Sequence, residues 1–327
     1  MNIKLVAPLA LLLLGACDGN PIGTGEDVPV EPCTEDCPVE PGDPVVIPAL
    51  LGANLKAIVY DEVSDSFRIT FTSLDTTPRV ATWDRLEALE ADIPGYRAYF
   101  VQEDPLDRFF LGLARTSNDG SVTAIAAGDG GQFNRVFHGG SYARNGAWNA
   151  PVGTEANGSG QVSYAGTYAA VTNIPAPRPG QIMPVDPPQA PELIPGQPSR
   201  VAGKIFINAN FTDNAVNGAI YNRVLVDYNF GLESVILVAT DIEANGTFVG
   251  ITERWPIKEE IGVYGGVFGG TDATAVGGVV ALTALYGSLD GLVMEGGREH
   301  GVFVLQKCGT AGDADICREV EPDEIDD

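Results

Sequence analysis

The second half of the chain is divided into short apolar stretches by turn residues at regular intervals, and this pattern limits the fold more than any other feature. The stretches are rich in Val, Ile, Tyr, Phe and Gly, which is typical of β-strands, and none has the period of a helix. Eight antiparallel strands avoid exposed edges by closing into a barrel or by forming a sandwich. We predict an eight-stranded antiparallel β-barrel at residues 158–308, with strands at 161–174, 200–211, 215–224, 233–242, 246–254, 261–269, 275–285 and 300–308.

The sixth and seventh of these strands flank a glycine-rich turn. Residues 262–282 read GVYGGVFGGTDATAVGGVVAL. This stretch contains neither GxxxxGK[ST] nor GxGxxG, and no helix follows it to hold a phosphate, so we exclude a nucleotide-binding loop. The break GGTDAT is typical of a hairpin turn. The glycines are therefore expected to allow a tight hairpin and close packing of the strands.

Residues 50–157 form a smaller segment with the same β character. The stretch WDRLEALEADI, residues 83–93, is expected to be a helix because Leu86, Leu89 and Ile93 fall on one helical face. We predict a small antiparallel β domain with one helix, and hence a chain that is mainly β. Its strands are expected at 55–63, 66–74, 95–103, 107–115, 121–130 and 134–144.

The N-terminus predicts export and lipid attachment. One Lys precedes an apolar run, residues 5–14, that is too short to cross a bilayer as a helix. Small residues at 15–16 directly before Cys17 resemble the bacterial lipobox, which implies that residues 1–16 are a lipoprotein signal peptide and that Cys17 is acylated. In some bacteria Asp18 at the next position retains lipoproteins at the inner membrane, so the choice of membrane stays open.

Three further segments are expected to carry little packed structure. Residues 17–49 are rich in Pro and acids and contain no Lys or Arg, which predicts an extended tether. Residues 309–327 are an acidic tail, which is expected to be disordered beyond Cys317. Residues 175–198 hold nine Pro in 24 positions, between the first two barrel strands. This insertion is either disordered or recognises a partner.

The formal net charge of -25 argues against binding to nucleic acid or to an anionic lipid surface. The acidity either only keeps the protein soluble or favours a basic partner.

Four cysteines remain once Cys17 is assigned to the lipid anchor: Cys33, Cys37, Cys308 and Cys317. An even number of cysteines in an exported protein predicts disulfides. The local pairs Cys33–Cys37 and Cys308–Cys317 need the fewest assumptions, although three connectivities are open. A metal site is disfavoured because the chain has no CxxC and only two His.

We predict no catalytic residue, no metal and no cofactor. The stretch His138-Gly139-Gly140-Ser141 invites comparison with an oxyanion-hole loop, but the chain has no GxSxG, and a triad would have to recruit His138 or His300. The turn residues Asp129, Asp213, Asp272 and Asp290 do not follow the spacing of a calcium loop.

The glycine-rich hairpin resembles that of a known family. The F-Y-G-P-x-A-x-E-x-G-G hairpin of the transferrin-binding protein B β-barrel is matched in spacing by Phe268, Gly270, Ala273, Gly277 and Gly278, with departures at Gly269, Thr271 and Ala275. The stretch NANFTDNAVNGAIYN, residues 208–222, resembles the same family's strand–turn–strand, and GVFVLQKC resembles its closing strand.

The resemblance covers residues 158–308 at most. It implies a barrel preceded by a smaller "handle" domain, here residues 50–157, and no catalysis. Members of the family bind transferrin, haem proteins or host factors through variable loops. Together with the lipobox, this predicts a lipid-anchored protein of the bacterial envelope, at the outer membrane on its periplasmic face or at the cell surface. It would bind a protein or a small nutrient-type ligand; the alternative is a periplasmic structural or assembly lipoprotein.

Overall fold

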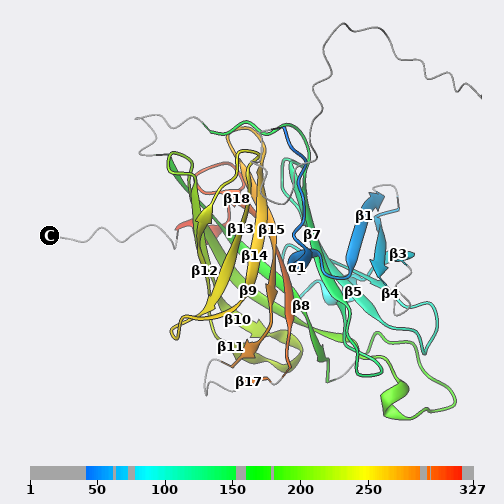
Figure 1. Cartoon of the computed structure of the whole chain (residues 1–327). Helices are drawn as coiled ribbons and strands as arrows, with labels where there is room; N and C mark the ends of the chain where they lie inside the picture. Colours follow the sequence, from blue (N-terminus) through cyan, green and yellow to red (C-terminus); the bar gives the residue numbers. More distant parts are fainter. Residues whose placement is uncertain are drawn as a thin grey trace, which may run out of the picture. The chain divides into compact units, whose positions relative to one another are not determined.

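The structure is a computed structural model, and it describes residues 42–61, 64–72, 78–151, 160–177, 180–287, 293–294 and 296–318. These residues form two large antiparallel β-sheets within one compact unit of the chain, Val39–Asp327 (Figure 1). We call the first sheet the handle and the second the barrel. The prediction of a mainly β chain is confirmed. None of the helices in the described ranges is long and apolar enough to cross a membrane.

The handle is a meander in which each strand pairs with the next one along the chain. A single helical turn, α1 (Ala49–Gly52), precedes it. Its strands are β1 (Leu55–Asp61), β2 (Ser66–Thr72), β3 (Pro78–Arg85), β4 (Arg97–Val101), β5 (Phe110–Thr116), β6 (Val122–Asp129) and β7 (His138–Arg144). The predicted antiparallel sheet is therefore present, with β3 as a strand that the sequence did not reveal.

The predicted helix at residues 83–93 is wrong. Strand β3 runs through Trp83 to Arg85, and only the short 3₁₀-helix η1 (Glu87–Leu89) follows it. Trp83 is buried in the sheet, where its ring stacks on Phe71 at 5.9 Å between ring centroids. Burial of this large ring outweighs the weak helical preference that the leucine spacing expresses.

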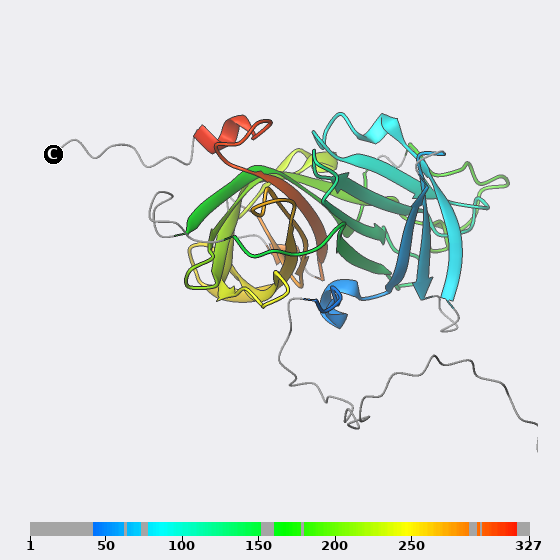
Figure 2. The same cartoon turned by 90° about the horizontal axis from the view of Figure 1, so that it is seen from above.

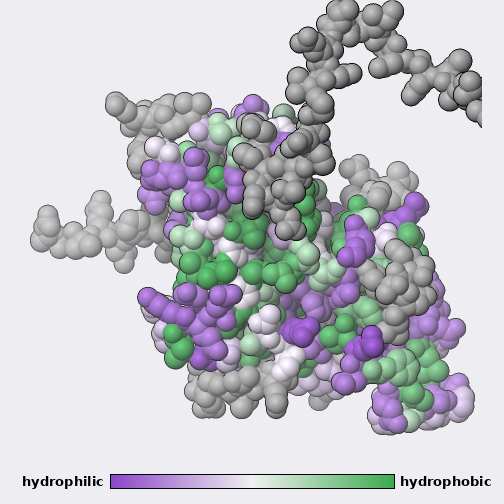
Figure 3. Space-filling view, in the orientation of Figure 1, coloured by the Kyte–Doolittle hydropathy of each residue, from purple (hydrophilic) through white to green (hydrophobic). Residues whose placement is uncertain are grey.

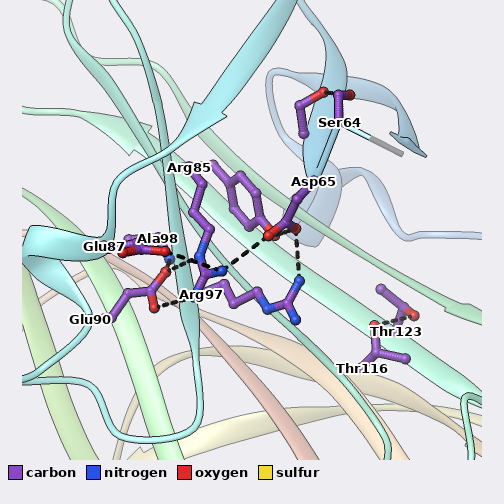
Figure 4. Close-up of polar contacts among 11 residues, drawn as sticks. Ser64, Asp65, Arg85, Glu87, Glu90, Arg97, Ala98, Thr116 and Thr123 are labelled. Carbon is purple, nitrogen blue, oxygen red and sulfur yellow. Dashed lines mark hydrogen bonds and ion pairs between the residues drawn. The ribbon is translucent and has the colours of Figure 1, made fainter. Parts of the chain in front are cut away.

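A polar cluster fixes the end of β3 (Figure 4). The Arg85 guanidinium donates to both carboxylate oxygens of Glu90, at 2.9 and 2.8 Å. Asp65, in the β1–β2 turn, accepts hydrogen bonds from Arg85, Arg97 and the Tyr99 hydroxyl. The carboxylates and guanidinium groups of this cluster already bind one another, so we assign it a structural role.

Eight strands close the barrel, and β18 pairs back with β8 (Figure 2). Around the ring they are β8 (Gln161–Pro175), β9 (Pro198–Asn210), β10 (Ala215–Leu225), β12 (Val235–Asp241), β13 (Thr247–Arg254), β14 (Glu259–Gly269), β15 (Ala275–Leu282) and β18 (Glu299–Lys307). The predicted eight-stranded barrel is confirmed. Three short strands were not predicted: β11 (Phe230–Leu232), β16 (Leu285–Tyr286) and β17 (Val293–Met294).

The inside of the barrel is filled with side chains. Its core includes the fully buried rings of Tyr164, Tyr168, Tyr264, Phe248, Phe268 and Phe303. Gly301 shows how tightly they pack, because a Cβ atom there would lie 1.7 Å from the Tyr168 hydroxyl. In the described part of the chain this barrel therefore has a packed core and not a ligand chamber.

The handle packs on the outer wall of the barrel. One cluster of buried side chains joins Leu111, Ala124 and Tyr142 of the handle to Val279 and Val302 of the barrel. Every residue of β15 is buried, because alternate side chains point into the barrel and toward the handle. This double burial explains why β15 is a continuous apolar run.

The two C-terminal cysteines form the Cys308–Cys317 disulfide, with Cα atoms 5.4 Å apart. This is one of the two local pairs that the sequence favours. The 3₁₀-helix η5 (Asp315–Arg318) folds back so that Ile316 and Cys317 are buried in a small cluster with Ala165. Cys33, Cys37 and residues 319–327 lie outside the described residues.

Candidate functional site

The residues of the predicted family hairpin lie where the barrel meets the handle. Phe268 is buried inside the barrel, and the Tyr164 hydroxyl donates to the Ala273 carbonyl at 2.6 Å. Gly270 has a φ of 78°, as the tight turn between β14 and β15 requires. A Cβ atom on Gly277 would lie 2.5 Å from the Val122 side chain of the handle. Gly278 faces the neighbouring strand, where its Cβ atom would lie 2.1 Å from the Gly265 carbonyl oxygen.

This hairpin is held to the β5–β6 turn of the handle by one carboxylate. Asp119 accepts a hydrogen bond from the Thr274 hydroxyl at 2.6 Å, and others from the hydroxyls of Ser117 and Ser121. Burial opposes its ionisation, but these hydroxyl hydrogen bonds hold the pKa of Asp119 well below its usual value. The hairpin thus joins the two sheets through the hydrogen bond between Thr274 and Asp119.

The two histidines meet at the same interface, one on a strand of the handle and the other on a strand of the barrel. The His138 ring on β7 and the His300 ring on β18 lie 4.3 Å apart between centroids. Within the described residues, neither nitrogen of His300 and not Nδ1 of His138 has a hydrogen-bond partner. Burial lowers the pKa of His138 to about 4 and that of His300 to about 3. Uncharged imidazoles packed in this way fit a structural contact.

A small cavity adjoins these rings. Asp129 and Arg298 line it together with the two histidines, and it has room for about one water molecule. Ser141, the last residue of the stretch compared with an oxyanion-hole loop, lies opposite Ile125 in the β6–β7 pairing, within the handle sheet. In the described ranges, no group of three or more His, Cys, Asp or Glu side chains is placed to hold a metal ion.

The described part of the Pro-rich insertion, residues 180–197, is docked on the handle. The Gly130 amide donates to the Gly196 carbonyl at 3.1 Å, and the Gly196 amide donates to the Gly131 carbonyl at 2.9 Å. A Cβ atom on Gly196 would lie 2.4 Å from the Gly130 oxygen, so only two glycines can approach in this way. The expectation of a disordered insertion is wrong for these residues, because the handle supplies backbone partners to the loop.

Two buried glutamine side chains complete the attachment. The Gln132 amide donates to the carbonyls of Leu106 and Leu193, both at 2.8 Å. The Gln102 side chain accepts from the Met183 amide at 2.8 Å and donates to the Asp107 carbonyl at 3.1 Å. Each glutamine therefore joins a loop of the handle to the Pro-rich loop.

A partly buried arginine also binds these loops. The Arg108 guanidinium binds the Asp129 carboxylate and donates to the carbonyls of Gln132 and Arg135, at 2.7 and 2.9 Å. It also lies over the Phe137 ring, 4.8 Å from its centroid. The loops are thus fixed by charged and amide hydrogen bonds and not only by their own proline content.

Large apolar side chains of these loops are exposed to solvent. We call residues 102–108, 130–137 and 180–197 the loop surface. Its exposed apolar side chains are Leu106, Phe133, Met183, Leu193 and Ile194. Figure 3 shows hydrophobic side chains over the loop that carries the 3₁₀-helix η3 (Pro191–Leu193), with hydrophilic ones around them. Exposed apolar side chains on a fixed scaffold are typical of a binding surface.

The sequence pointed to only part of this site. The high proline content of residues 175–198 marked the insertion in the sequence. Partner recognition was one of its two interpretations. Nothing in the sequence marks Gln102, Gln132 or Arg108, because their partners are backbone carbonyls brought together by folding. Cys17, the predicted lipid attachment site, lies outside the described residues.

Neither a protein-family model nor a curated protein sequence matches the chain. Among solved structures, a double mutant of transferrin-binding protein B from Haemophilus parasuis Hp5 aligns with 74% of this chain and 51% of its own, at 12% identity and a TM-score of 0.35. Intact Ap-TbpB, with N and C lobes, aligns with 74% of this chain and 52% of its own, at 11% identity and a TM-score of 0.33.

A third structure, of a surface lipoprotein, aligns with 77% of this chain and 97% of its own, at 12% identity and a TM-score of 0.31. The chain spans about half the length of the transferrin-binding proteins it matches. Transferrin-binding protein B and a surface lipoprotein are thus among the structures to which the chain is similar.

Proposed function

We propose that this chain is a lipid-anchored protein of the bacterial envelope that binds a protein partner through the loop surface. The observation that supports this most is the set of five apolar side chains held in water by a bonded scaffold. The buried centres of protein interfaces are more apolar than their rims and are enriched in aromatic and Met side chains. The packed barrel core favours a macromolecular partner over a small ligand held inside the barrel.

Site-specific photo-crosslinking in the native bacterium tests the binding surface. Phe133 is replaced by benzoylphenylalanine in the full chain, and Val80 on the handle is the matched control because the two side chains are 56% and 57% exposed. We expect a discrete crosslinked protein adduct at Phe133 that is absent at Val80. The same adducts at both positions, or none at Phe133, would contradict the proposal.

The anchor is tested separately. Cys17→Ala removes the thiol that the lipobox predicts to be acylated. We expect this variant to lose incorporation of labelled fatty acid and to leave the membrane fraction. A variant that still sediments with membranes would show that Cys17 is not the anchor.

A periplasmic assembly role is the second candidate, and Asp18 is the residue that favours it. Protease treatment of intact cells, with a periplasmic marker as control, separates the two. Digestion of the chain from outside supports a surface role. Protection of the chain until the outer membrane is opened supports the periplasmic one.

A further inference from the structure

The loop surface carries an excess of negative charge around its apolar side chains. Its described residues include five carboxylates, Glu103, Asp104, Asp107, Asp186 and Glu192, against two arginines, Arg108 and Arg135. Arg108 faces inward and binds Asp129, so it does not offset these charges at the surface. No lysine occurs in these three segments. The rim is therefore acidic.

Three of these carboxylates are available to a partner. Asp104, Asp186 and Glu192 are exposed, and no ion pair of theirs occurs within the described residues. They come from two different loops: Asp104 precedes the exposed Leu106, and Glu192 precedes the exposed Leu193 and Ile194. Leu106, Met183, Leu193 and Ile194 are thus close in the chain to a solvated negative charge, whereas Phe133 lies two residues from the exposed Arg135.

We infer that the partner bound at the loop surface is a protein segment with apolar side chains flanked by lysine or arginine. This inference rests on the proposed function and adds the chemistry of the partner. Apolar side chains at the centre supply most of the affinity, while complementary charges at the rim select the partner and raise the rate of encounter. The net charge of -25 acts in the same direction, since it repels acidic proteins at long range.

The probe is a pair of synthetic peptides with identical central Trp and Leu residues, one flanked by lysines and the other by glutamates. Crosslinking of each peptide is measured on the full chain with benzoylphenylalanine at Phe133. In low salt we expect the lysine peptide to be captured about tenfold more efficiently than the glutamate peptide. This preference should decline as salt shortens the screening length to about 3 Å at 1 M.

A matched pair of charge variants locates the effect. The triple variant Asp104→Asn, Asp186→Asn, Glu192→Gln should lose most of the preference for the lysine peptide. The control, Asp213→Asn, Asp241→Asn, Glu243→Gln, removes the same formal charge from exposed positions at the other end of the β8–β9 pair. It should keep the preference. Equal thermal melting of both variants and the parent shows that the fold is unchanged.

Two results would overturn the inference. Equal capture of the two peptides, or loss of preference in both triple variants alike, would show that the acidic rim does not select the partner. Capture of neither peptide, together with a cellular adduct at Phe133, would leave the proposed function standing and reject a cationic partner. Absence of the cellular adduct would instead reject the proposed function itself.

Discussion

At the scale of single residues, the histidine pair links the handle–barrel contact to pH. His138 and His300 are both buried, and burial lowers their pKa values to about 4 and about 3 from an ordinary 6.5. At pH values between 6.5 and these lowered pKa values, the unfolded chain therefore binds more protons than the folded chain. Above pH 6.5 the two histidines do not reduce the free energy of unfolding. This free energy decreases as the pH falls from 6.5 toward 4.

This loss can be measured between pH 6.5 and pH 5, where most carboxylates are still ionised. For two such groups we expect the free energy of unfolding to fall by on the order of 3 kcal/mol over this range. The charged groups beside the rings are Asp129, Arg298 and Glu299. Burial raises the pKa of Asp129, so the folded chain binds a proton at this carboxylate more readily than the unfolded chain does. Protonation of Asp129 therefore opposes the loss of stability that the two histidines cause.

The double variant His138→Gln, His300→Gln removes the two groups and leaves these neighbours in place. Urea unfolding at each pH should then show a flatter profile. An unchanged slope would mean that other groups cause the acid sensitivity.

At the scale of elements, the docking of the Pro-rich loop depends on the Gly130–Gly196 contact. Gly196→Ala places a methyl group 2.4 Å from the Gly130 oxygen, which the backbone must relieve by separating. We expect a loss of about 1–3 kcal/mol in stability and faster proteolysis within residues 180–197. Gly180→Ala is the matched control in the same loop, since no atom lies within 4 Å of its added methyl group. Equal proteolysis of both variants would show that the glycine contact does not hold the loop.

At the scale of the whole molecule, handle and barrel share one buried cluster, beside a core inside the barrel and another within the handle. The shared cluster is made of side chains from both sheets, among them Leu111 and Tyr142 of the handle and Val279 and Val302 of the barrel. Separating the sheets would expose the apolar faces of β5–β7 and of β15 to water. The two sheets are therefore expected to unfold together.

A fragment of residues 42–151 tests this dependence. Expressed without the barrel, it should aggregate or lack a cooperative thermal transition, whereas the full chain should unfold in a single step. A fragment that is monomeric and melts cooperatively would show that the handle folds alone.

The sequence by itself indicated eight barrel strands from apolar stretches and turn residues, and it favoured the local Cys308–Cys317 pair because the two cysteines are near each other in the chain. The residues left a barrel or a sandwich open, and the pairing of the distant strands β18 and β8 decided for the closed barrel. It failed at residues 83–93, where leucine spacing predicted a helix and the burial of Trp83 decided for a strand. Pairing with distant strands is not visible in a local period.

Only the tertiary structure decided what the glycines and the Pro-rich loop do. The sequence explained Gly277 by strand packing, but the group it accommodates is Val122 of the handle. Gln132 joins Leu106 to Leu193, two residues far apart in the chain. Such contacts depend on how segments that are distant in the chain pack against one another. A local sequence pattern in one segment does not specify the shape of the segment that packs on it.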